Sequence, residues 1–288
     1  MAATPKSKNP RFLGPNVILK PPLRLSPWRK IAMGTWRDAK DPSVYGILEL
    51  DSEKALQFID KLKRETGARI TLTHLVGKIM AETLARHPEI NCVLRWGKLY
   101  PRQNVDVFFQ VATDAEGEDL SGMTVRNADR KSLAQIATEM NERVQAIKQK
   151  KDRTFDQTKT MMGLLPGFLA GLMIDFISLI TYSLNLWSPA MGSPRDPFGS
   201  MMVTNIGSLG LDTAFAPLVP YSKVPVLIAV GESKLRPWVV DGQLAVRPIL
   251  RLCATFDHRL IDGVHASHMS RTVQKIFADP ERELTRLT

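Results

Sequence analysis

The stretch of this chain that most directly indicates its fold is FDHRLIDG, at residues 256–263. It lies between an apolar run at 249–256, typical of a strand, and a run at 264–277 with the apolar spacing of a helix. His258 therefore stands at a strand-to-helix turn, flanked by acids and an arginine. An imidazole in this setting suits proton transfer near neutral pH, and it equally suits a structural histidine that ties a turn together.

Outward from this turn, strands and helices mix without a regular strand–helix–strand order. We expect strands at 44–50, 94–100, 105–113, 201–205, 224–231 and 249–256, and helices at 52–65, 73–85, 131–151 and 264–277. Asp241-Gly242 is a typical hairpin dipeptide, and a second turn is expected at Gly97-Lys98. The pattern predicts an α/β fold with a mixed sheet and helices packed on it.

The composition, 44% apolar and 24% charged over 288 residues, is that of an ordinary globular protein. Residues 1–37 contain eight Lys or Arg and no acid, so they supply most of the net charge of +10. We expect a basic extended arm at 1–25, either solvated or lying on phosphate groups, an anionic membrane surface or an acidic partner. A basic stripe with interleaved aromatics is missing elsewhere, so nucleic-acid binding is not expected. The start does not resemble a secretory signal, which favours the cytoplasm.

Cysteine and histidine usage points away from disulfides and metals. Cys92 and Cys253 lie in apolar stretches and are predicted to be buried, inert thiols, in keeping with a reducing compartment. His265 and His268 have helical i, i+3 spacing, but two ligands without a third are weak evidence. We therefore expect no metal.

Residues 161–187 form an unusual segment with a single charge, Asp175. Its length would permit a membrane span, but four Gly and Pro residues in its first half and the central Asp175 argue against one. We expect one or two helices that pack on a partner subunit or dip into a membrane interface. A single span and an ordinary buried hairpin remain alternatives.

The stretch at 256–263 resembles the His-x-x-x-Asp-Gly signature of the catalytic domain of dihydrolipoyl acyltransferases, the core subunits of 2-oxo-acid dehydrogenase complexes, and more distantly that of chloramphenicol acetyltransferase. Further stretches resemble this family in the right order: LSPWRKIA at 25–32, LARHPEIN at 84–91, VRNADRKSL at 125–133, VTNIG at 203–207 and VLIAVG at 226–231. The resemblance implies a trimeric chloramphenicol acetyltransferase-like fold, a mixed β-sheet flanked by helices. Residues 26–288 would be its catalytic domain, with an apolar insertion at about 155–199.

The resemblance also implies a reaction, the transfer of an acyl group between coenzyme A and a dihydrolipoyl-type thiol without a metal. His258 would be the general base, and Thr204 would donate a hydrogen bond to the oxyanion. Asp262 would order the turn by pairing with Arg29, with Lys30 as the alternative partner. In this family the His and the Ser or Thr come from adjacent chains of the trimer.

Departures from the family pattern leave other functions open. The catalytic region starts almost at once, so we expect the lipoyl group on a separate carrier protein or another acceptor in its place. Residues 119–125 differ from the family's apolar motif, which changes the expected wall of the substrate channel. One alternative is a catalytically silent assembly or membrane-associated scaffold. Another, an antibiotic-type acetyltransferase, is disfavoured by Arg259 and the Asn127-Ala128-Asp129 motif.

Overall fold

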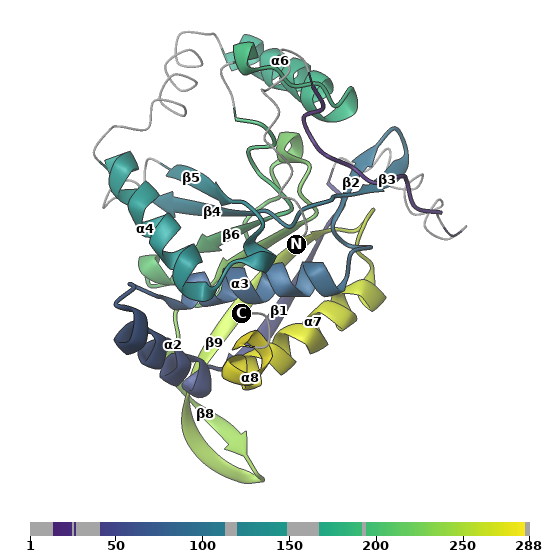
Figure 1. Cartoon of the computed structure of the whole chain (residues 1–288). Helices are drawn as coiled ribbons and strands as arrows, with labels where there is room; N and C mark the ends of the chain where they lie inside the picture. Colours follow the sequence, from purple (N-terminus) through teal and green to yellow (C-terminus); the bar gives the residue numbers. More distant parts are fainter. Residues whose placement is uncertain are drawn as a thin grey trace, which may run out of the picture.

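A single mixed sheet forms the centre of the protein in a computed structural model that describes residues 14–24, 26, 41–112, 120–148, 167–191 and 194–285. The strands in it are β1 (Ser43–Asp51), β4 (Val107–Ala112), β5 (Leu120–Val125), β6 (Met201–Asn205), β7 (Val226–Val230), β8 (Lys234–Val240) and β9 (Gln243–Asp257). Their order is β1-β9-β7-β6-β4-β5, and β8 pairs with the first half of β9 (Figure 1). β4, β6 and β7 run parallel and the other pairs antiparallel, which confirms the predicted mixed sheet.

Helices cover one face of this sheet (Figure 1). These helices are α2 (Glu53–Thr66), α3 (Leu72–Arg86), α4 (Leu133–Lys148), α7 (Gly263–Ala278) and α8 (Pro280–Thr285), whereas α6 (Gly167–Ser178) lies apart from this layer. α3 is buried on nearly every side, because it lies between the sheet and α7 and α4. Gly77 of α3 allows the closest approach: a Cβ there would stand 2.2 Å from the ring of buried Phe109. The main core therefore lies between this helix and the sheet.

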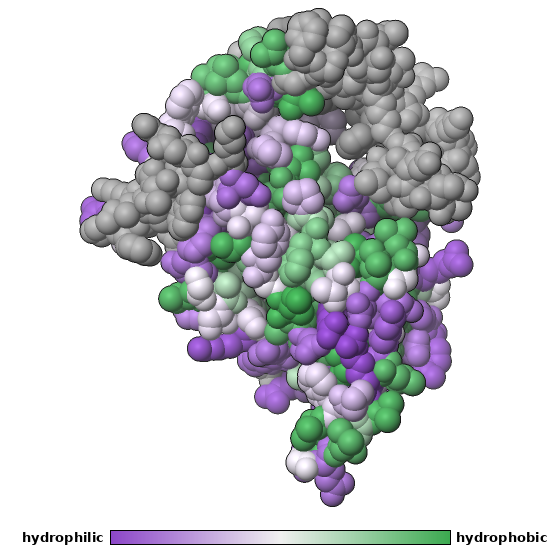
Figure 2. Space-filling view, turned by 180° about the vertical axis from the view of Figure 1, so that it is seen from behind, coloured by the Kyte–Doolittle hydropathy of each residue, from purple (hydrophilic) through white to green (hydrophobic). Residues whose placement is uncertain are grey.

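The opposite face of the sheet is covered mainly by chain without regular structure. Phe108, Met202 and Leu227 point to this side and pack against Val224 and the apolar residues of 216–219. Figure 2, the view from behind, shows apolar atoms over this face and on the β8–β9 hairpin at the bottom. Much of the hairpin's apolar surface is exposed, including Leu235 and Leu244 at 73% and 78%. This exposure leaves an apolar surface for another chain to cover.

Two hairpins test the turn predictions. The β8–β9 turn has Asp241 and Gly242 at φ 50° and 79°, the left-handed pair of a tight hairpin, so this prediction is confirmed. The small second sheet pairs β2 (Cys92–Arg95) with β3 (Lys98–Pro101). Its turn is Trp96-Gly97, at φ 50° and 69°, so the predicted position is wrong by one residue. Pairing of Arg95 with Lys98 sets this register.

The apolar segment predicted at 161–187 is described from residue 167 onward. α6 is followed by one turn of π-helix, η2 (Leu179–Ser183), and the chain then reaches the N-terminal segment. There the backbones of Gly14 and Trp187 exchange hydrogen bonds of 2.9 and 2.7 Å, so residues 14–19 lie beside the end of the insertion. Among the described helices none is long and apolar enough to cross a membrane. Residues 1–13 and 161–166 lie outside the described residues.

His74 belongs to the N-terminal cap of α3. The backbone N–H of Thr71 donates to His74 Nδ1 at 3.1 Å, and the Thr71 side chain accepts from the His74 backbone. The residue at this position is usually Glu or Gln, and here an imidazole takes the acceptor role. Burial lowers the pKa of His74 to about 4, so the folded protein holds this ring neutral.

We predict that this neutral ring makes folding pH-dependent. An unfolded histidine has a pKa of about 6.5, so the stabilisation is complete above that pH. It is lost as the pH falls towards 4, by about 3 kcal/mol in all. His74→Gln keeps the acceptor without titrating. Urea unfolding between these pH values should therefore show the variant gaining stability over the wild type as the pH falls. Parallel curves would contradict the assignment.

Candidate active site

The turn that carries His258 is held by hydrogen bonds from two sides. β9 ends at Asp257, whose backbone N–H donates to the Pro225 oxygen at 2.9 Å. The N–H of His258 donates to the Pro42 oxygen at 3.0 Å. Pro225 and Pro42 precede the neighbouring strands β7 and β1. The backbone of His258 is therefore fixed by the sheet itself.

Asp257, directly before His258, forms an ion pair with Arg259, directly after it. Arg259 donates from Nε and Nη2 to the two carboxylate oxygens of Asp257, at 2.9 and 2.7 Å. Asp257 is buried, and its hydrogen bonds raise the pKa of the Arg259 guanidinium. A bidentate pair of this kind is geometrically specific. It fixes the side chains around the half-buried histidine.

Asp262 caps the helix that follows. One carboxylate oxygen accepts from the backbone N–H groups of Val264 and His265, each at 3.0 Å, and lies 2.6 Å from His265 Nδ1. The sequence predicted a role for Asp262 in ordering the turn but not this cap, although an acid directly before the first helical residue is a known start signal. The expected partner, Arg29, lies outside the described residues.

Thr204 lies far from His258 within one chain. It is the fourth residue of β6 and pairs with Ala229 of β7, which pairs with Cys253 of β9. Cys253 precedes His258 by five positions, so the two side chains are separated by about 17 Å along the strands and about 10 Å across them. The structure therefore places these two predicted residues at opposite ends of the sheet.

A cavity of about 330 Å³ adjoins the end of the strand that carries Thr204. Its wall includes Asn205 at the end of β6, Ser208 and Glu232 after β6 and β7, and Lys63 and Thr71 of the helix layer. Carboxyl ends of neighbouring parallel strands are a common ligand position in open sheets. The Thr204 end of the sheet thus has room for a substrate.

The insertion reaches the other end of the sheet, close to His258. α6 packs on the short helix η5 (Pro220–Ser222), which leads into Lys223. Burial lowers the pKa of Lys223, and so does the nearby charge of Arg259, while Asp175 of α6 acts in the opposite sense. The packing of α6 on η5 therefore brings the insertion near the turn that carries His258.

The two cysteines and the two histidines of α7 have the following contacts in the structure. Cys92 and Cys253 are buried free thiols, as predicted, and burial raises the pKa of Cys92 to about 12. His265 contacts Asp262, and His268 stacks on His87 with ring centroids 6.1 Å apart. The described residues contain no group of three or more potential ligands that could hold a metal ion.

The chain belongs to the family described as 2-oxoacid dehydrogenases acyltransferase (catalytic domain), whose model matches residues 23–162 and 197–285. A curated relative is the dihydrolipoyllysine-residue acetyltransferase component of the pyruvate dehydrogenase complex of Staphylococcus aureus, 24% identical over 246 residues. That match covers 83% of this chain and 47% of the relative, so the chain spans about half the length of the relative.

Two solved structures share the fold. A probable dihydrolipoamide acetyltransferase from Listeria monocytogenes has a TM-score of 0.63 at 19% identity, covering 92% of this chain and 97% of the other. The dihydrolipoamide acetyltransferase of Azotobacter vinelandii has a TM-score of 0.62 at 20% identity, covering 91% and 99%. The predicted fold class, a mixed sheet flanked by helices, is confirmed.

We predict that Asp262 acts mainly as a helix cap. Asp262→Ala should lower the free energy of unfolding by about 1 kcal/mol, whereas Asp262→Asn should retain most stability, because asparagine caps equally well. Thermal unfolding measures both, with Asp60→Ala on the surface of α2 as a control. If asparagine is as harmful as alanine, then an ion pair of Asp262, rather than the cap, dominates.

Proposed function

We propose that this chain transfers an acyl group between coenzyme A and a dihydrolipoyl-type thiol, with His258 as the general base. The observation that carries the proposal is the fixed turn of His258 in a chain of the acyltransferase family. In water a thiol has a pKa of about 8.5 and an imidazole about 6.5, so proton transfer from one to the other is uphill by roughly 2.7 kcal/mol. This is a modest cost for generating a thiolate nucleophile.

Thr204 is the proposed donor to the oxyanion formed when the thiolate attacks the thioester. Removing one such donor typically lowers turnover by about 10²–10³. In the Azotobacter enzyme a serine, a histidine and an asparagine were investigated for their role in the mechanism; the serine lies 52 positions before the histidine and the asparagine four after it. Here Thr204 lies 54 positions before His258 and Asp262 four after it. The similar spacing supports the assignment.

The separation of Thr204 from His258 supports an active site shared between chains. Side chains so far apart along one rigid sheet cannot contact one reacting group, so Thr204 of one copy would meet His258 of the next in a cyclic trimer. The exposed apolar side chains of the β8–β9 hairpin, Val239 and Val246 at 67% and 71% among them, offer a surface for such an assembly. Residues 26–288, with the insertion at about 155–199, would be the catalytic domain.

Mixing two inactive variants tests the shared site. His258→Ala and Thr204→Ala, each prepared alone, should assemble normally and lose acyl transfer between acetyl-CoA and dihydrolipoamide. In a cyclic trimer each mixed assembly regains one intact site. Random co-assembly of equal amounts should therefore restore about a quarter of wild-type activity.

Two results would contradict this proposal. If the mixed assemblies stay as inactive as the single variants, the two residues do not meet across an interface. If His258→Ala retains most activity in a correctly assembled trimer, then His258 is not the base. A wild-type protein inactive towards a panel of acyl-CoAs would instead support the silent scaffold.

We further propose that the insertion attaches the protein peripherally to an anionic membrane from the cytoplasm. Leu172 and Phe176 of α6 are 63% and 61% exposed, an apolar surface that suits a headgroup layer. The Gly14–Trp187 pairing brings the N-terminal segment against the insertion, and residues 1–37 carry eight basic residues without an acid. Each basic residue near an anionic surface adds about 1 kcal/mol.

Vesicle sedimentation tests this attachment. The protein should bind phosphatidylserine-containing vesicles, less so at high salt, and the double variant Leu172→Asp, Phe176→Asp should lose binding. Leu209→Asp, at a similarly exposed apolar residue of another segment, is the control and should bind normally. Equal binding by the double variant, or none by the wild type, would contradict the membrane proposal.

A further inference from the structure

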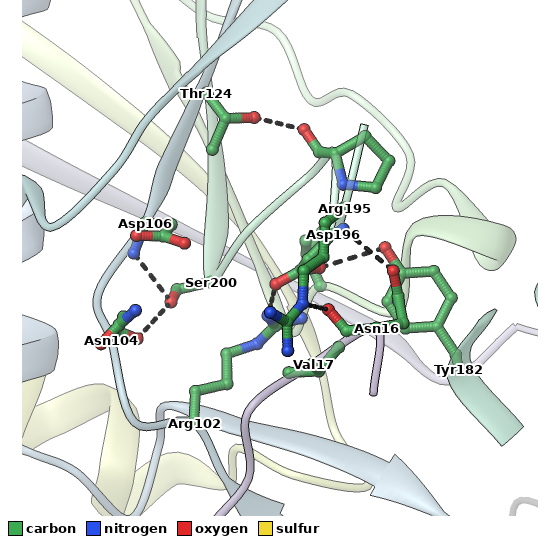
Figure 3. A network of polar contacts seen from close by, with 12 residues as sticks. Asn16, Val17, Arg102, Asn104, Asp106, Thr124, Tyr182, Arg195, Asp196 and Ser200 are labelled. Carbon is green, nitrogen blue, oxygen red and sulfur yellow. Dashed lines mark hydrogen bonds and ion pairs between the residues drawn. The ribbon is translucent and has the colours of Figure 1, made fainter. Parts of the chain in front are cut away.

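A polar cavity of about 360 Å³ lies between the N-terminal segment and the segments that lead into β4 and β6. Its polar wall includes Asn16, Arg102, Asp106, Arg126, Arg195 and Asp196. Figure 3 shows Arg102 reaching toward Asp196, with Asn16 and Arg195 beside this pair. The volume falls at the small end of the range for ligand sites, about 300–1,000 Å³.

Arg102 is a buried cation whose position is fixed. Its side chain is 3% exposed, and its Nη1 forms an ion pair with Asp196, which is also buried. Asp196 in turn accepts from the Tyr182 hydroxyl at 3.3 Å, and its backbone N–H donates to Asn16 Oδ1 at 3.0 Å. The guanidinium therefore has one edge held and cannot swing into solvent without breaking this network.

The other edge of Arg102 is unsatisfied. Nε and Nη2 of Arg102 are buried and have no hydrogen-bond partner among the described residues. These two nitrogens form the planar fork that binds carboxylate or phosphate oxygens in a bidentate manner. Asn16 Nδ2 is a third buried donor with no partner there, and its orientation is fixed because Oδ1 already accepts from Asp196. Unpaired buried donors are costly, so this set favours an acceptor ligand.

The net charge of the residues that line the cavity is positive, which also favours an anionic ligand. Of the described lining residues, three are arginines and two are aspartates. Asp106 is paired with Arg126 at 2.9 Å, and Arg195 Nε donates to the Asn16 backbone oxygen at 2.9 Å. Burial lowers the pKa of Arg195; the charge of Asp196 raises it and that of Arg126 lowers it. The cavity therefore has an excess of positive charge.

The cavity is distinct from the candidate active site. Asp106 precedes β4, whose first residue is level with Phe256 of β9 through β6 and β7. Three strand spacings separate them, about 14 Å. The lining also includes residues 16–18, Trp187, Arg195 and Asp196. None of these has a role in the proposed acyl transfer.

We propose that this cavity binds a small oxoanion, a phosphoryl or carboxylate group, between the free fork of Arg102, the amide of Asn16 and the guanidinium groups of Arg126 and Arg195. The bound anion would join three segments far apart in sequence: the N-terminal segment, the start of β4 and the end of the insertion. It would thereby stabilise the insertion on the domain.

Isothermal titration calorimetry on the full chain tests the site, with inorganic phosphate and succinate as separate probes against chloride of equal ionic strength. Saturable binding at one site per chain is expected for at least one probe. Tighter binding of phosphate would identify a phosphoryl site, and tighter binding of succinate a carboxylate site. Arg126→Gln and Arg195→Gln should each weaken binding by about tenfold, the loss of one charge-assisted contact.

A matched control and a subtler variant complete the test. Arg130→Gln removes one positive charge at a 73% exposed side chain and should leave the affinity unchanged. Arg102→Lys keeps a cation opposite Asp196 but lacks the fork, so it should abolish binding while circular dichroism stays native. No saturable binding of either probe by the wild type would overturn the proposal. Equal affinity in wild type, Arg126→Gln and Arg195→Gln would do the same.

Discussion

The pairing of β9 with three other strands is the constraint on which the rest of the structure depends. Its second half lies between β1 and β7 and its first half pairs with β8, so one strand belongs both to the centre of the sheet and to the projecting hairpin. A slip of one residue would exchange Leu252 and Cys253 between the two faces. The register is fixed because each face is buried against a different cluster, and it places His258 at the strand end.

The rigid sheet also keeps His258 and Thr204 apart within one chain. His258 follows a strand that runs antiparallel to β7, whereas Thr204 lies near the end of a strand parallel to β7. The two residues therefore lie at opposite ends of the sheet, and no local adjustment can bring them together. In the proposed trimer, assembly would bring the two residues together. The hydrogen bonds of Asp257, Arg259 and Asp262 hold the turn that carries His258.

A polar network attaches the insertion to the domain beside a small apolar cluster that Tyr182 shares with Val17 and Val93. Arg102, which follows β3, pairs with Asp196, and Asn16 adds the N-terminal segment. A buried ion pair offsets its desolvation cost only when its geometry is good and its remaining donors and acceptors form hydrogen bonds. The exposed apolar side chains of α6 remain on the outside of this attachment.

The sequence by itself determined the family and most of the elements, because strand and helix periods, the Asp241-Gly242 turn and the His-x-x-x-Asp-Gly motif are local properties. The strands β5 and β8 were not among those it predicted. It also marked His258 and Thr204, by resemblance. Only the tertiary structure decided that these two lie far apart, that His74 is a buried cap acceptor, and that Arg102 meets Asn16 and Asp196. The burial of His74 and the other two findings depend on packing between residues distant in the chain, which sequence spacing does not encode.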